Sequence, residues 1–170
     1  MSDAFENEQK SGIFGFLNNL QPIADLFLRV WVAWVFYTSG LTKVASESLF
    51  KFLNLNFGYP TSLAPTDTTI FLFEEEYQVP ILPAELAAQL GTAAEIIIPL
   101  FIIFGLFSRL AAIGLFVFNI VAVLSYPPAQ AGNGLILHIM WGLMLLMVIA
   151  HGPGKISLDH LFSSAMRRSD

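Results

Sequence analysis

Long apolar runs separated by short polar breaks dominate the pattern along the chain. Between Arg109 and Lys155 lie 45 residues without one charged side chain, more than twice the roughly 20 residues that a helix needs to cross a hydrocarbon layer. A Tyr-Pro-Pro break at Tyr126 divides this run, so we expect two spans there, and the same pattern predicts two more upstream. The four predicted spans cover residues 22–44, 83–107, 109–126 and 134–151.

The predicted fold is an all-α membrane protein, a four-transmembrane-helix bundle with a long extracytoplasmic loop between helices 1 and 2. This loop covers residues 45–83, where prolines, glycine and asparagines break the helical periodicity. Residues 1–21 are expected to form a cytoplasmic tail and a short amphipathic segment on the membrane surface. Residues 152–170 are expected to form a second cytoplasmic tail with a short surface helix, for which Ser157 is the predicted N-cap.

Composition supports a membrane protein and excludes several other classes. Hydrophobic residues make up 55% of the chain and charged residues 12%, whereas about a quarter of the residues in soluble domains are charged. The lipid bilayer is therefore the first expected partner. A net charge of -5 removes the electrostatic attraction that dominates nucleic-acid binding. The chain has no cysteine, which excludes thiolate-held metals and thiol relays.

The distribution of basic residues predicts the orientation. Six of the eight Lys and Arg residues fall on one side of the predicted spans, namely Lys10, Arg29, Arg109, Lys155, Arg167 and Arg168, and two fall on the other, namely Lys43 and Lys51. Because basic residues collect on the cytoplasmic side, both termini should be cytoplasmic. We expect a multi-pass protein of the cell inner (cytoplasmic) membrane.

Polar side chains fall within the predicted spans, among them Arg29, Glu95 and Asn119. An ionisable group in a span costs a few kcal/mol, so Arg29 and Glu95 should face the bundle interior and find a partner. We expect them to form an intramembrane polar pair, with Asn119 adding a hydrogen bond at the same depth. Alternatively, Arg29 pairs with Asp25, four residues earlier, and extends to the cytoplasmic interface.

A second group of polar residues lies near the outer face. Lys43 ends the first span, while His138 and Trp141 share a face at the start of the fourth. If the loop folds over them, it brings Glu75 and Tyr77 to the same place. The five residues are candidates for a ligand-binding pocket under an apolar lid. The alternative is an ordinary interfacial belt of Lys, Trp and Tyr.

Metal sites and haem are not expected. Met140, Met144 and Met147 form a thioether stripe, but it faces away from His138. His138 and His151 are about 20 Å apart by helical rise, too far to ligate one haem. We therefore expect no metal and no cofactor held within the chain, and the sequence assigns no catalytic residue.

Several motifs in order resemble the DoxX family of small four-helix membrane proteins, over about residues 23–162. They are the Arg29, Phe36, Gly40, Lys43 stripe, the loop FLFEEEYQVPILPAELAA, the turn GLFSRLAA, the segment from His138 to Trp141, and HGPGKISLDHLF. The positions that match the family are Arg29, Lys43, Glu95, Arg109, His138 and Trp141. The resemblance implies a link to membrane redox chemistry, since some relatives take part in oxidation of sulfur compounds with quinone as acceptor and others belong to assemblies that handle oxidative or thiol stress.

The expected function is an accessory subunit of a membrane redox assembly, without activity of its own, that presents a pocket for a quinone or another small hydrophobic ligand. Any catalysis would belong to a quinone-linked oxidoreductase complex. A protein partner or a larger membrane complex is expected, and a homo-oligomer remains open. Two alternatives stand beside this prediction: a proton-coupled small-solute transporter that uses Glu95 and Arg29, or a purely structural subunit.

Overall fold

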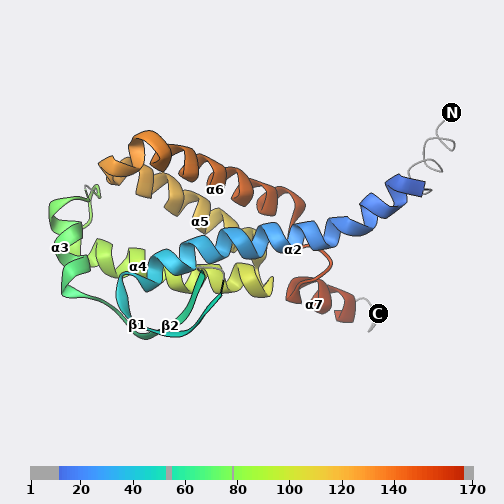
Figure 1. Cartoon of the computed structure of the whole chain (residues 1–170), viewed down its shortest axis with the longest axis horizontal. Helices are drawn as coiled ribbons and strands as arrows, with labels where there is room; N and C mark the ends of the chain where they lie inside the picture. The colour runs from blue at the N-terminus through green and yellow to red at the C-terminus, as the bar shows by residue number, and fades with distance from the viewer. Residues whose placement is uncertain (1–11, 53–54, 78, 167–170) are drawn as a thin grey trace.

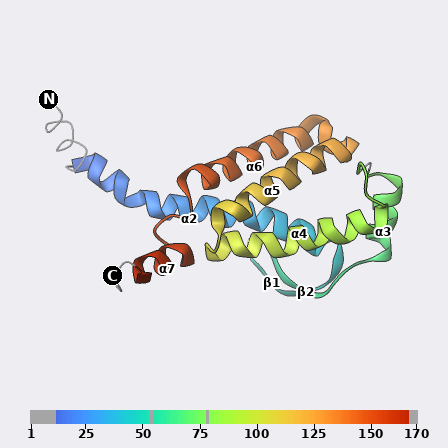
Figure 2. The same ribbon diagram turned by 180° about the vertical axis from the view of Figure 1, so that it is seen from behind.

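A computed structural model describes residues 12–52, 55–77 and 79–166, and this part of the chain is mostly helical. The long helices are α2 (Gly12–Leu41), α4 (Ala84–Phe104), α5 (Ser108–Ser125) and α6 (Gly132–His151); the short ones are α3 (Asp67–Glu75), the 3-10 helix η1 (Pro127–Gln130) and α7 (Leu158–Met166). The long helices pack side by side in alternating directions, and the start of α2 lies at the same end as α7 (Figures 1 and 2).

Three of the long helices, α4, α5 and α6, are long and apolar enough to cross a membrane. Large apolar side chains cover their outer faces: Phe104 is 60% exposed, Leu124 70% and Leu143 58%. A lipid-facing surface has this composition, because the hydrocarbon solvates such side chains. Helix α2 is longer but less apolar, since it carries Asp25 and Arg29.

An antiparallel hairpin occupies part of the segment that the sequence predicted to be a loop, which corrects the all-α prediction. Its strands are β1 (Val44–Phe52) and β2 (Leu55–Pro65). Apolar and non-apolar residues alternate only at the start of β2, over residues 55–59, and β1 shows no such period of two, so the sequence pattern gives little sign of the hairpin. Phe57 stacks on Phe50 across the hairpin, with ring centroids 4.6 Å apart, and packs on Trp34 of α2, with ring centroids 4.5 Å apart. The hairpin is therefore attached to the side of α2.

Helix α2 is continuous from Gly12, so the predicted amphipathic surface segment is not separate from the first long helix. Pro22 was expected at the first position of that helix, but it lies inside α2. A proline removes one backbone hydrogen bond from a helix. The residues before it already have helical periodicity, so the helix continues on both sides.

The core lies where the four long helices meet, and its buried apolar residues are Val32, Ala33, Phe36, Ile102, Ala112, Leu115, Leu145 and Val148. Gly40 lets α2 approach α4 closely, because a Cβ atom at Gly40 would lie 3.1 Å from the backbone carbonyl carbon of Glu95. The last turn of α2 is therefore level with Glu95. Since Glu95 is the twelfth residue of α4, the first turns of α4 extend beyond the end of α2.

Candidate functional site

A cavity of about 490 Å³ lies between the end of α2 and helices α4, α5 and α6. Its polar lining includes Ser39, Lys43, Tyr77, Glu95, His138 and Trp141. The structure thus brings together four of the five residues that the sequence proposed for a ligand pocket, and it adds Glu95 to them. These side chains come from four segments that are far apart in the sequence.

An ion pair between Lys43 and Glu95 forms one wall of the cavity. Lys43 Nζ lies 2.5 Å from Glu95 Oε2, and the two side chains are only 16% and 8% exposed. Ser39 joins both groups, since its Oγ accepts a hydrogen bond from Lys43 Nζ at 3.0 Å and donates one to Glu95 Oε1 at 3.1 Å. An ammonium group has three donors. Glu95 and Ser39 accept from two of them, and the third has no acceptor among the described residues.

The predicted pair of Arg29 with Glu95 is wrong, because Lys43 takes the place of Arg29. Arg29 is eleven residues before Gly40 on α2, a rise of roughly 16 Å, and Gly40 is level with Glu95. The prediction assumed that the two helices overlap along their whole length. Because α4 extends beyond α2, Glu95 is level with the last turn of α2. Lys43 lies just after that turn and can therefore reach Glu95.

Asn119 and His138 form a reciprocal pair across α5 and α6. Asn119 Nδ2 donates to the backbone carbonyl oxygen of His138 at 2.9 Å, and this turns Asn119 Oδ1 toward His138 Nδ1 at 2.7 Å. A carbonyl oxygen only accepts, so Nδ1 carries the proton. In a neutral ring Nε2 is then an acceptor, and among the described residues it has no partner. Asn119 therefore fixes the tautomer of His138. The sequence had predicted that Asn119 would join Arg29 and Glu95, and this arrangement is not formed among the described residues.

Trp141 and Tyr77 are among the aromatic residues of the cavity wall. The Trp141 ring lies edge-on to the His138 ring, with centroids 4.8 Å apart. Tyr77 lies between two rings, stacked on Phe73 at 4.3 Å and on Tyr126 at 4.5 Å. Burial raises the pKa of Tyr77 to about 12, and the negative charge of Glu95 adds to this shift. The phenol is thus neutral near pH 7 and can donate a hydrogen bond.

Glu75 does not line the cavity, and its side chain is exposed. The buried face of α3 is formed by Thr69 and Phe73, which are four residues apart and share one side of the helix, while Glu75 points elsewhere. Ser39 and Tyr126 line the cavity although the sequence analysis did not assign them to it. Ser39 precedes Lys43 by four residues, a spacing that places side chains on neighbouring turns.

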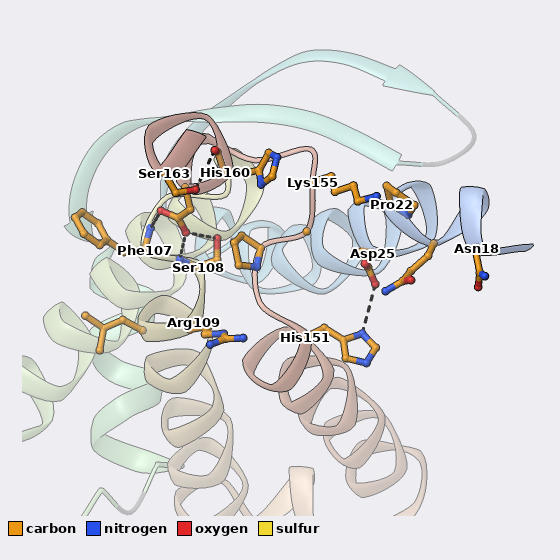
Figure 3. A pocket seen from close by; sticks show the side chains of 15 residues that line it. Asn18, Pro22, Asp25, Phe107, Ser108, Arg109, His151, Lys155, His160 and Ser163 are labelled. Atoms are coloured by element: carbon orange, nitrogen blue, oxygen red, sulfur yellow. Dashed lines mark hydrogen bonds and ion pairs between the residues drawn. The ribbon is translucent and has the colours of Figure 1, made fainter. Parts of the chain in front are cut away.

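Arg29 is buried at the opposite end of the bundle, where it holds the segment that follows α6. Its guanidinium donates to the backbone carbonyl oxygens of Pro153 and of Ile156, the latter at 2.7 Å, and the residue is 2% exposed. The alternative pair with Asp25 is not formed among the described residues. Asp25 Oδ1 instead lies 3.6 Å from His151 Nδ1 (Figure 3).

A polar hollow of about 760 Å³ lies at this end, between α2, the start of α5 and α7 (Figure 3). Asp159 of α7 caps α5, because its carboxylate accepts from the backbone N–H of Phe107 at 2.8 Å and of Ser108 at 3.0 Å. Ser157 Oγ accepts from the backbone N–H of His160 at 3.1 Å. The predicted N-cap at Ser157 is thus confirmed, and α7 is fixed to the bundle by side chains of the chain itself.

Metal-binding groups of three or more His, Asp or Glu side chains do not occur among the described residues. The candidate site is therefore the cavity at Lys43 and Glu95, which offers an ion pair, a histidine with a fixed tautomer, a neutral phenol and an indole. It could bind a small molecule with hydrogen-bonding oxygen atoms.

Comparison with known proteins gives the family. The family model described as DoxX matches residues 24–127, more than half of the chain. A curated protein of Haemophilus influenzae, described as an uncharacterized protein, is 30% identical over 144 residues, which cover 82% of this chain and 83% of the relative. No solved structure matches the chain. With its three apolar membrane-length helices, the chain is an integral membrane protein that belongs to the DoxX family.

Proposed function

We propose that the cavity binds the head group of a quinone or a similar molecule with carbonyl oxygens, and that the chain serves as an accessory subunit of a membrane redox assembly. The observation that supports this proposal is the set of donors on one cavity wall. Lys43 has one donor left, Tyr77 is a neutral phenol, and Trp141 has an indole N–H. Carbonyl oxygens of a quinone need such donors.

The site also suits the reduced form of such a ligand. A quinol presents hydroxyl groups, which need acceptors, and His138 Nε2 is an acceptor once Asn119 holds the proton on Nδ1. Glu95 is the other acceptor on the wall. Because donors and acceptors lie around one cavity, the site can hydrogen-bond both redox states without rearranging its charges.

We further propose that α2 crosses the membrane with α4, α5 and α6, and that both termini are cytoplasmic in the inner membrane. Helix α2 packs against α4 and α6, and both Arg29, buried within it, and Lys43, just after its end, have partners within the chain. Arg109 and Lys155 lie at the end of the bundle that holds α7 (Figure 3), as the positive-inside rule expects of a cytoplasmic side. Topology reporters fused to either end should both report the cytoplasm.

The redox centre is assigned to a partner protein in this proposal. The chain has no cysteine, so it has no thiolate to bind an iron–sulfur cluster. A partner that carries the centre would need access to the cavity end of the bundle. Crosslinking in native membranes, followed by identification of the linked proteins, tests for such a partner, and a homo-oligomer is the other outcome.

The decisive experiment is equilibrium binding of a quinone in its reduced quinol form, whose hydroxyl groups can donate to His138 Nε2, to the purified protein in lipid nanodiscs, with empty nanodiscs as the blank. His138→Ala removes the acceptor and should weaken binding by roughly tenfold, the equivalent of one hydrogen bond of about 1.4 kcal/mol. Met140→Ala is the matched control, because Met140 is on the same helix but 46% exposed and outside the cavity. Equal affinity of wild type and His138→Ala would contradict the pocket.

A transporter is the second candidate, and the observation that favours it is a buried acid beside a cavity. Such acids mark proton pathways in membrane proteins. The relay would run through Glu95 and Lys43 instead of Arg29. Proton-coupled solute uptake into proteoliposomes that is lost in Glu95→Gln would support transport, whereas a stoichiometric complex that tolerates both substitutions, Glu95→Gln and His138→Ala, would support a structural subunit.

A further inference from the structure

An apolar groove of about 310 Å³ runs along α4 and α5 on the outside of the bundle. Four exposed side chains on its rim open it to the surrounding lipid: Leu82, Leu90, Val117 and Val121. Its floor is formed by small residues, with Ala87, Gly91 and Ala94 on α4 and Gly114 and Ala122 on α5. Small residues on two facing helices leave a channel that large side chains would fill.

The groove adjoins the polar cavity. Tyr77, Phe118 and Ala122 line both of them, so these three residues form the wall that the two spaces share. A polar atom also lies in the groove: Ser125 Oγ is buried and has no hydrogen-bond partner among the described residues. Ser125 precedes Tyr126, which lines the cavity. The unpaired hydroxyl is therefore close in sequence to the polar end.

We propose that the groove holds the linear apolar tail of the ligand whose head group occupies the cavity, so that the site takes a single-tailed amphiphile that enters from the lipid. This inference rests on the proposed function. The dimensions and polarity of the two spaces fit the two parts of such a molecule, with hydrogen-bonding atoms around the head and almost only apolar atoms along the tail.

Tyr77 has a specific role in this arrangement. Its ring is fixed between Phe73, a groove residue, and Tyr126, a cavity residue. The bond between head and tail would pass this stack. A ligand without a tail could enter the cavity but would leave the groove empty, and its affinity would not depend on residues of the groove.

Nanodiscs that contain the protein test this inference with two probes, decylubiquinone and the corresponding benzoquinone head group without a tail. Affinity is expressed per probe concentration in the lipid, because the tailed probe partitions into the bilayer. Gly91→Leu should fill the groove, since a Cβ atom there has ordinary contacts of 3.5 Å or more and the rest of the side chain extends into the space. Ala94→Leu is an independent second variant in the same groove.

We expect wild type to bind the tailed probe about tenfold more tightly than the head group without a tail. Both variants should lose this difference in affinity, while their affinity for the head group alone should stay the same. Ile97→Phe is the control, because it adds bulk at an exposed position of α4 outside the groove, and it should change neither affinity. If the tail adds nothing, or the variants have no effect, the tail site is wrong while the head-group site stands. If neither probe binds, the proposed function fails first.

Discussion

Gly40 and Ile96 pack so closely that a Cβ atom on Gly40 would lie 2.8 Å from Ile96 Cγ1. This contact sets the position of α2 along α4 and so brings Lys43 to Glu95. Gly40→Ala should lower the free energy of unfolding by about 1–3 kcal/mol, the usual cost of overpacking a close contact. Thermal unfolding in detergent measures the loss. Gly114→Ala is the control, because its nearest atom would be 3.6 Å away; equal losses in the two variants would contradict the close contact.

Lys43 and Glu95 should depend on each other energetically. Removing one partner leaves the other charge buried, so Lys43→Met and Glu95→Gln should each destabilise the protein by about 3–5 kcal/mol. The double variant should be much more stable than the sum of the two losses predicts, because no unpaired charge remains. A double-mutant cycle on unfolding temperatures measures the coupling, and simple additivity would show that the pair does not interact.

Tyr77 makes stability depend on alkaline pH. Its pKa is raised from the ordinary value of 10.0 to about 12, so its neutral form is favoured in the folded state. The contribution of neutral Tyr77 to the free energy of unfolding is fully present below pH 10 and is lost as the pH rises toward 12. Unfolding temperatures should therefore fall less steeply over this range in Tyr77→Phe than in wild type. Parallel curves for the two proteins would mean that Tyr77 titrates normally.

Arg29 should control how firmly the segment after α6 is held. Arg29→Met leaves the carbonyl oxygens of Pro153 and Ile156 without their donor, so this segment should open more often. A lysine-specific protease should then cleave at the exposed Lys155 roughly tenfold faster than in wild type, which corresponds to a decrease of about 1.4 kcal/mol in the free energy of opening. Arg109→Met is the matched control, because Arg109 is exposed and bonds only to the carbonyl oxygen of Ala150 among the described residues. Equal rates in both variants would refute the role of Arg29.

The helices α4, α5 and α6 could be predicted from the sequence to within about three residues at each end. Long apolar runs with few charges, bounded by Gly, Pro or charged residues, are typical of membrane-crossing helices. The gathering of Lys43, His138 and Trp141 could also be predicted, since the end of the first span and the start of the fourth lie at the same side of the membrane. Their role as ligand-binding residues stays a prediction.

The partner of Glu95 could not be predicted, because rise per residue gives depth only relative to the start of the same helix. How far α4 extends beyond α2 depends on the contact at Gly40, which is a property of two helices together. The hairpin was missed for a related reason. Its stability comes from the packing of Phe57 on Trp34, a contact between segments that local pattern does not reveal.

Arg29 lies inside α2, and Lys43 lies two residues after its last residue, Leu41. Arg29 holds the segment after α6 at one end of the bundle, and Lys43 pairs with Glu95 at the other. A rotation of α2 about its long axis would therefore move Arg29 away from its carbonyl oxygens and, through the short turn after Leu41, would also shift Lys43 relative to Glu95.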